Sequence, residues 1–79
     1  MKARVYVTLK QSVFDPRGHT IADALHSLGY TSVGDVRQGK FFEIELDAPS
    51  AGQAKQIASE VADKVLASPV IESFRVEVD

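Results

Sequence analysis

The chain has 79 residues and no cysteine, and its nine basic and eleven acidic residues give a formal net charge of −2. This length predicts one domain, residues 1–79, whose core is so small that association with another subunit would stabilise it. The composition excludes disulfides, thiolate metal sites and cysteine catalysis, and the interspersed charges exclude the basic surface typical of a nucleic-acid-binding protein.

The first predicted element is a strand over Lys2 to Lys10. Its apolar residues Val5, Val7 and Leu9 recur at every second position, so one face of the strand is predicted to be buried. The alternation ends before the loop of residues 11–14, and the next signal along the chain is that of a helix start.

A helix is predicted over about residues 16–28. Asp15 suits the N-cap, because its carboxylate can accept hydrogen bonds from free backbone N–H groups. Pro16 suits the first helical position, because its missing donor would have had no partner there. The apolar residues of this helix form one stripe, which is predicted to face a sheet: Ile21, Ala24, Leu25 and Leu28.

Two glycines flank this helix with different expected roles. Gly29 directly follows the apolar stripe and is suited to a left-handed C-cap. Gly18 lies in the first helical turn, where glycine costs about 1 kcal/mol relative to alanine. Either another segment packs close to the Cα of Gly18, or the helix begins at Thr20.

A hairpin is predicted next. A β region from about Thr31 to Gln38 is followed by Gly39 and Lys40, and then by a strand from Phe41 to Asp47 with alternating apolar residues. The chain is therefore expected to turn near Gly39 and to pair these two strands.

A second helix and a last strand complete the chain. Ser50 and Gln53 have the spacing of a capping box, and Ser68 followed by Pro69 predicts the end of this helix. The last strand, about residues 71–78, again alternates apolar and polar residues. The apolar stripe of the second helix is Ala54, Ile57, Ala58, Val61 and Val65.

The order β-α-β-β-α-β predicts an α+β fold of the ferredoxin-like, split βαβ type. Such a fold has a four-stranded antiparallel sheet with two helices on one face. The other face would carry the aromatic residues Tyr6 and Phe41. Because this face is mixed and the domain is small, we expect a homodimer or a dimer of dimers.

Motifs of catalysis are weak in this chain. Residues 34–40 have the spacing of a phosphate-binding P-loop, but Phe41 stands where the motif has a Mg²⁺-binding Ser or Thr, and strands flank the segment. His19 and His26 are seven residues apart on the predicted helix, and two ligands do not make a zinc site. We therefore expect no catalytic residue, no metal and no cofactor in this chain.

Lys10, Arg37 and Lys40 lie at or near predicted strand ends, next to Gly39. These cations could converge on an anion or on an acidic partner. The alternative is that they only keep the surface soluble, which is the commoner role of surface lysine and arginine.

Four segments of the chain together resemble the PurS family, the small subunit of phosphoribosylformylglycinamidine (FGAM) synthase. In chain order they are Val7-Thr8-Leu9-Lys10, Asp15-Pro16-x-Gly18, Ala24-Leu25-x-x-Leu28-Gly29-Tyr30 and Val36-Arg37-x-Gly39-Lys40. The resemblance covers nearly the whole chain. One departure is Phe14, where the family often has leucine.

The resemblance implies a subunit of purine biosynthesis that performs no chemistry itself. In that family a large synthetase (PurL-type) uses ATP and magnesium to activate formylglycinamide ribonucleotide, and a glutaminase (PurQ-type) releases ammonia. The small subunit joins them and assists ammonia transfer. Lys10, Arg37, Gly39 and Lys40 are then the candidate partner-binding residues, and Asp15, Pro16, Gly18 and Gly29 the structural ones.

Other proteins of this fold remain as alternatives. An ACT-like regulatory domain dimerises and binds a small molecule, an RNA-binding domain reads bases on its sheet, and a small enzyme could share the same architecture. Acidic residues at positions 43 and 45 disfavour RNA. We expect a cytoplasmic protein, because the chain has no signal-peptide pattern and no apolar run long enough to cross a membrane.

Overall fold

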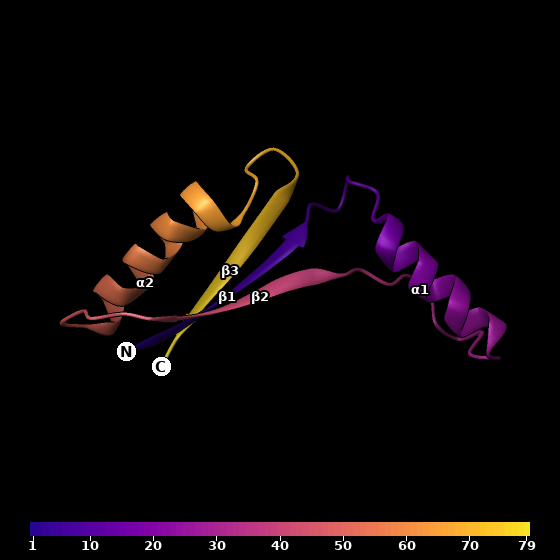
Figure 1. Cartoon of the computed structure of the whole chain (residues 1–79), viewed down its shortest axis with the longest axis horizontal. Coiled ribbons are helices and arrows are strands. Elements are labelled where there is room, and N and C mark those ends of the chain that lie inside the picture. Colours follow the sequence, from indigo (N-terminus) through magenta and orange to yellow (C-terminus); the bar gives the residue numbers. More distant parts are fainter.

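A three-stranded antiparallel sheet, in the order β2-β1-β3, forms the centre of the protein (Figure 1). The computed structural model describes residues 1–79. The strands are β1 (Lys2–Leu9), β2 (Gly39–Glu45) and β3 (Glu72–Val78). In the central strand β1, Val5 lies opposite Phe42 on one side and Val76 on the other, so the alternation seen in the sequence places apolar residues of all three strands on one face.

Helix α2 (Ala51–Val61) covers that apolar face, and a π-helical turn, η1 (Ala62–Leu66), extends it. The hydroxyl of Ser50 accepts a hydrogen bond from the N–H of Gln53 at 3.2 Å, as the capping-box spacing predicts. The small side chains of Ala54, Ala58 and Ala62 are fully buried, so the helix approaches the sheet closely. None of the helices has the length and apolar character needed to span a bilayer.

The core is small and is centred on two valines of β1 under α2 and its extension. Val5 and Val7 are the largest fully buried side chains, and they cluster with Ala62 and Ala67. Five partly buried residues pack against this cluster: Phe42, Ile44, Leu66, Phe74 and Val76. Such a core agrees with the expectation that a domain of this length gains stability from association.

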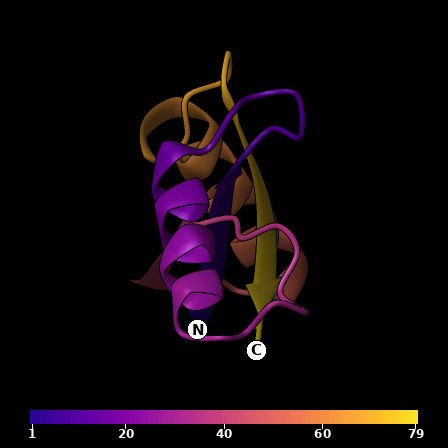
Figure 2. The same ribbon diagram turned by 90° about the vertical axis from the view of Figure 1, so that its right-hand side faces the viewer.

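Helix α1 (Pro16–Ser27) stands away from the sheet rather than on it (Figures 1 and 2). Residues 28–38 return antiparallel along α1, with the carbonyl of Val33 at 2.7 Å from Nε2 of His26. We call residues 16–38 the arm. The arm gives the chain its elongated shape, with extents of 50 × 25 × 14 Å.

The predicted four-stranded sheet with both helices on one face is therefore wrong for the single chain. Residues 31–38 form no strand, because they run beside α1 and have no strand neighbour. The predicted hairpin at Gly39 is also wrong, since the chain passes straight through Gly39 into β2. The α1 stripe does not face its own sheet, and Leu28 is 74% exposed.

Candidate partner-binding site

The junction between the sheet and the arm is built around Asp15. Its carboxylate accepts hydrogen bonds from the N–H of Gly18 at 2.9 Å and from the N–H of Gln38 at 2.7 Å, and the residue is only 5% exposed. Asp15 is thus the N-cap of α1 and also holds the chain that enters β2. These two N–H groups, and then the charge of Arg37, hold the pKa of the Asp15 carboxyl below its ordinary value, although burial opposes them.

Gly18 lies where another part of the chain comes closest to α1. A Cβ at this position would be 1.8 Å from the carbonyl oxygen of Val36, so no larger residue fits without movement of the backbone. The helix begins at Pro16, and close packing against Cα is the reason for a glycine in its first turn. At the other end of the helix, Gly29 has φ of 99° and adopts the left-handed conformation that the sequence predicts.

Arg37 is bonded within the chain and does not extend freely from a turn. Its Nη2 donates to the carbonyl of Lys10 at 2.9 Å and to the carbonyl of Val13 at 2.8 Å. The side chain therefore fixes the loop between β1 and α1 to the segment before β2. We call Asp15, Gly18, Val36, Arg37 and Gln38 the arm junction.

Lys10 and Lys40 lie at the same end of the sheet as the arm junction. Nζ of Lys10 donates to the carbonyl of Pro69 at 2.9 Å, and Nζ of Lys40 is 3.3 Å from Oε2 of Glu72. The N–H of Ser68 donates to the other oxygen of Glu72 at 2.8 Å, and together with Lys40 it lowers the pKa of this carboxyl. The predicted cations are thus brought together, and both lysines remain exposed.

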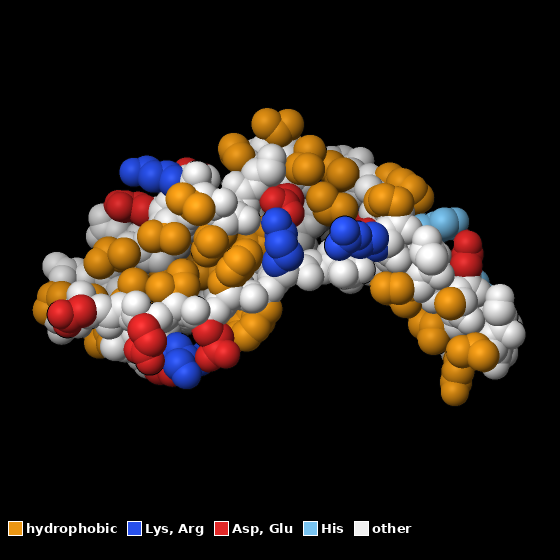
Figure 3. Space-filling model, in the orientation of Figure 1, with side chains coloured by type: hydrophobic (Ala, Val, Ile, Leu, Met, Phe, Trp, Pro, Cys, Tyr) orange, Lys and Arg blue, Asp and Glu red, His pale blue; other side chains and the backbone are white.

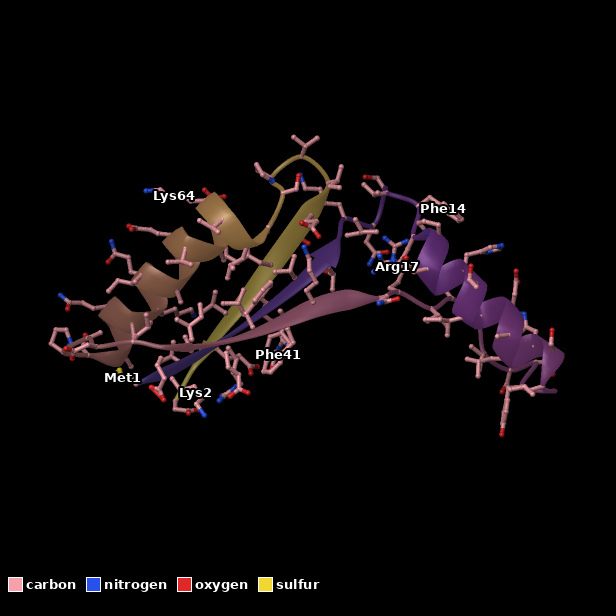
Figure 4. All side chains as sticks on the ribbon, in the orientation of Figure 1. Met1, Lys2, Phe14, Arg17, Phe41 and Lys64 are labelled. Carbon is pink, nitrogen blue, oxygen red and sulfur yellow. The ribbon has the colours of Figure 1, made fainter.

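A groove of about 320 Å³ lies where the arm leaves the sheet. Its charged and polar lining is Asp15, Arg17, Gln38, Lys40 and Glu72. Sequence reasoning did not select Arg17 and Glu72, because neither belongs to a motif. Figure 3 shows blue side chains gathered at this part of the surface, and Figure 4 places Arg17 at the start of α1. The mixed charges suit a polar protein surface better than a lone anion.

The sheet face opposite α2 is an ordered, uncovered surface. The rings of Tyr6 and Phe41 are 5.1 Å apart, and the guanidinium of Arg75 lies 4.4 Å from the centre of the Tyr6 ring. The Tyr6 hydroxyl donates to Glu77 at 3.1 Å, and Arg4 bonds Asp79 at 2.7 Å. These contacts link all three strands and leave a flat surface of aromatic and charged groups.

The other candidate motifs lack the structure that their chemistry requires. The segment of residues 34–40 leads into a strand, so no helix N-terminus follows to bind phosphate. His19 pairs with Asp23 at 3.4 Å, and His26 contacts the Val33 carbonyl. No three His, Asp or Glu side chains converge as a metal site would require.

Comparison with known proteins identifies the family. Residues 2–79 match the family model of PurS, described as phosphoribosylformylglycinamidine (FGAM) synthase. The PurS subunit of FGAM synthase from Bacillus subtilis is 44% identical over 78 residues, which are 99% of this chain and 92% of that relative. The relative from Synechocystis is 43% identical over 75 residues, 95% of this chain and 75% of that relative.

Solved structures have the same fold over nearly the whole chain. PurS of Methanocaldococcus jannaschii, described as a subunit of formylglycinamide ribonucleotide amidotransferase in the purine biosynthetic pathway, has a TM-score of 0.90 at 35% identity over 99% of this chain and 94% of its own. A chain in the structure of PurLQS from Thermotoga maritima has a TM-score of 0.87 at 30% identity, over 96% and 93%. The chain therefore belongs to the PurS family, the small subunits of FGAM synthase in purine biosynthesis.

Proposed function

We propose that this chain is a non-catalytic subunit that holds a PurL-type synthetase and a PurQ-type glutaminase together and assists ammonia transfer between them. The observation that carries the proposal is the TM-score of 0.87 to a chain in the PurLQS structure of T. maritima, over nearly the full length of both chains. In this proposal ATP and magnesium bind to the large subunit, and the complex works in the cytoplasm.

The contacts of the most buried polar side chains support a binding role. Asp15, the most buried carboxylate, accepts hydrogen bonds from two backbone N–H groups, and Arg37 donates to two backbone carbonyls. Both side chains therefore stabilise the chain's own fold. Other polar groups are exposed in the groove and on the uncovered sheet face, among them Lys40 and Arg75. Such surfaces give electrostatic complementarity and specificity in complexes.

Self-association is part of this proposal. The sheet face around Tyr6 and Phe41 is uncovered, β2 has a free edge, and the core is small. A homodimer or a dimer of dimers would cover such surfaces. Sedimentation of the purified protein at tens of micromolar tests this, and a strictly monomeric species of 8.6 kDa would contradict it.

Docking of the larger subunits is proposed at the end of the sheet that carries Lys10 and Lys40. Arg37 and Gly39 belong to this surface as positioning residues, because Arg37 fixes the adjacent loop and a Cβ at Gly39 would be 2.5 Å from the Val7 carbonyl oxygen. Lys40, the second residue of β2, lines the groove.

The double variant Lys10→Ala/Lys40→Ala should assemble more weakly with the PurL-type and PurQ-type subunits, because it removes two exposed charges from this surface. Thermal unfolding should change little, since exposed substitutions usually alter stability by less than about 0.5 kcal/mol. Size-exclusion chromatography of the three-subunit mixture measures the effect.

A matched control is Lys55→Ala/Lys64→Ala, which removes the same charge from exposed positions of α2 and η1. Assembly of this control should equal that of the wild type. If the Lys10→Ala/Lys40→Ala variant also assembles like the wild type, the docking role of these lysines is wrong.

A further inference from the structure

Exposed apolar side chains gather at the end of the sheet that carries Lys10 and Lys40. Phe14, Val70 and Ile71 are 68%, 78% and 43% exposed, and they belong to the loops that follow β1 and precede β3. We call these three residues the apolar ridge. Figure 3 shows hydrophobic side chains along the upper margin of the molecule, above the blue side chains at its centre. Apolar side chains that gather in this way are typical of an interaction site.

The two loops of the apolar ridge are joined through Lys10. The N–H of Lys10 donates to the carbonyl of Ile71 at 2.8 Å, and its Nζ donates to the carbonyl of Pro69 at 2.9 Å. The carbonyl of Lys10 accepts a hydrogen bond from the N–H of Val13 at 2.9 Å. The loop before Phe14 and the loop around Val70 therefore lie side by side.

The loop that carries Val70 is also closed on itself. The N–H of Glu72 donates to the carbonyl of Ser68 at 2.8 Å, and the N–H of Ser68 donates to Oε1 of Glu72 at 2.8 Å. These bonds hold Val70 on the outer side of an ordered turn, although leaving an aliphatic side chain in water costs free energy. A partner that covers Val70 would remove this cost.

The charge of this end of the chain differs in sign from that of the whole chain. Residues 9–17, 36–40 and 67–72 contain four basic and two acidic residues, a net charge of +2, whereas the whole chain has −2. Both acids, Asp15 and Glu72, already accept hydrogen bonds from backbone N–H groups. Arg17 is exposed, lines the groove and has no hydrogen-bond or ion-pair partner. The charge left to be neutralised at the groove is therefore positive.

We propose that this end of the sheet binds an acidic, amphipathic segment of one of the two larger subunits. Apolar side chains of that segment cover the apolar ridge, and its carboxylates pair with Arg17 and Lys40. The inference rests on the bridging role proposed above and specifies the chemistry of the partner. It adds Phe14, Arg17 and Val70 to the docking surface.

A protein segment fits these features better than a nucleic acid or a lipid surface. The groove contains the carboxylates of Asp15 and Glu72 beside its cations, and these carboxylates would repel closely spaced phosphates. A protein segment can instead offer carboxylates to the cations, polar N–H groups to Glu72 and apolar side chains to Val70. Such complementarity of charge provides specificity in protein complexes.

The first test reverses the charge at Arg17. Arg17→Glu should weaken binding to the larger subunit by about fivefold or more, the factor for a strong exposed ion pair, and the effect should shrink as salt is raised. Arg17→Lys keeps the charge and should retain most of the affinity. Lys64→Glu makes the same reversal in η1 and should bind like the wild type. Titration calorimetry with the purified PurL-type and PurQ-type subunits, each in turn, measures the dissociation constants.

The second test changes the apolar ridge. Val70→Asp should weaken the same binding by about tenfold or more, because it places a charge where apolar contact is expected. Val70→Leu keeps the side chain apolar and should bind like the wild type. Val70 is 78% exposed, so both variants should keep the urea midpoint of the wild type.

The outcomes separate this inference from the bridging role. A wild type that binds neither larger subunit would contradict the bridging role itself. If the wild type binds, and Arg17→Glu and Val70→Asp bind equally well, the bridging role stands and this docking surface is wrong. Weaker binding by Arg17→Glu alone would overturn the amphipathic partner. Flotation of the wild type, but not of Val70→Asp, with vesicles that contain phosphatidylserine would overturn the protein partner in favour of a membrane surface.

Discussion

The Gly18→Ala variant is expected to be less stable than the wild type by about 1 to 3 kcal/mol, the range for an added methyl group in a site without room. The new Cβ would be 1.8 Å from the Val36 carbonyl oxygen, and a backbone atom cannot rotate away as a flexible side chain can. The segment around Val36 would have to separate from the start of α1. The midpoint of urea unfolding measures this loss.

Gly52→Ala is the matched control, because Gly52 also lies in the first turn of a helix. A Cβ there would meet only the Ser50 hydroxyl, at 3.9 Å, which is ordinary contact. This variant should gain up to about 1 kcal/mol from the better helix propensity of alanine. If both variants move the urea midpoint in the same direction, the close approach at Gly18 does not limit stability.

Asp15→Ala should lower the urea midpoint clearly at neutral pH, because it leaves the N–H groups of Gly18 and Gln38 without their acceptor and releases the segment before β2 from the start of α1. Asp47→Ala, at an exposed position outside any helix or strand, is the control and should change the midpoint little.

The pH dependence of this difference has a defined sign. The pKa of Asp15 is lowered in the folded protein, so its contribution to stability is complete above the pKa of the unfolded chain, about 4, and is lost as the pH falls through the folded pKa. The midpoints of the wild type and of Asp15→Ala should therefore converge in acid. A difference that stays constant from neutral to acid pH would show that the carboxylate charge contributes nothing.

Local features of the fold were readable from the sequence, because they depend on neighbouring residues. The caps at Asp15 and Ser50, the left-handed Gly29 and the alternation in β1 are all present as predicted. The error lay at Gly39, where glycine between two apolar runs indicated a hairpin. Periodicity shows which residues require burial, but it does not show which segment buries them or whether that segment belongs to the same chain.

The candidate site shows the same limit. The sequence suggested that Lys10, Arg37 and Lys40 could converge, and they do lie at one end of the sheet. It gave no sign that Arg37 bonds carbonyls 24 and 27 residues away, or that Glu72 pairs with Lys40. The glycine at position 18 indicated a close contact with another segment. Only the fold identifies that segment as the one that contains the Val36 carbonyl.

The most direct test of the proposed function is to measure FGAM formation by the PurL-type and PurQ-type subunits with and without this chain. Glutamine-dependent formation should require the chain, and ammonia-dependent formation by the PurL-type subunit should not, because the chain is proposed to bridge subunits and not to react. The chain alone should neither hydrolyse ATP or glutamine nor form product. A full glutamine-dependent rate in its absence would contradict the proposal that it joins the two enzymes.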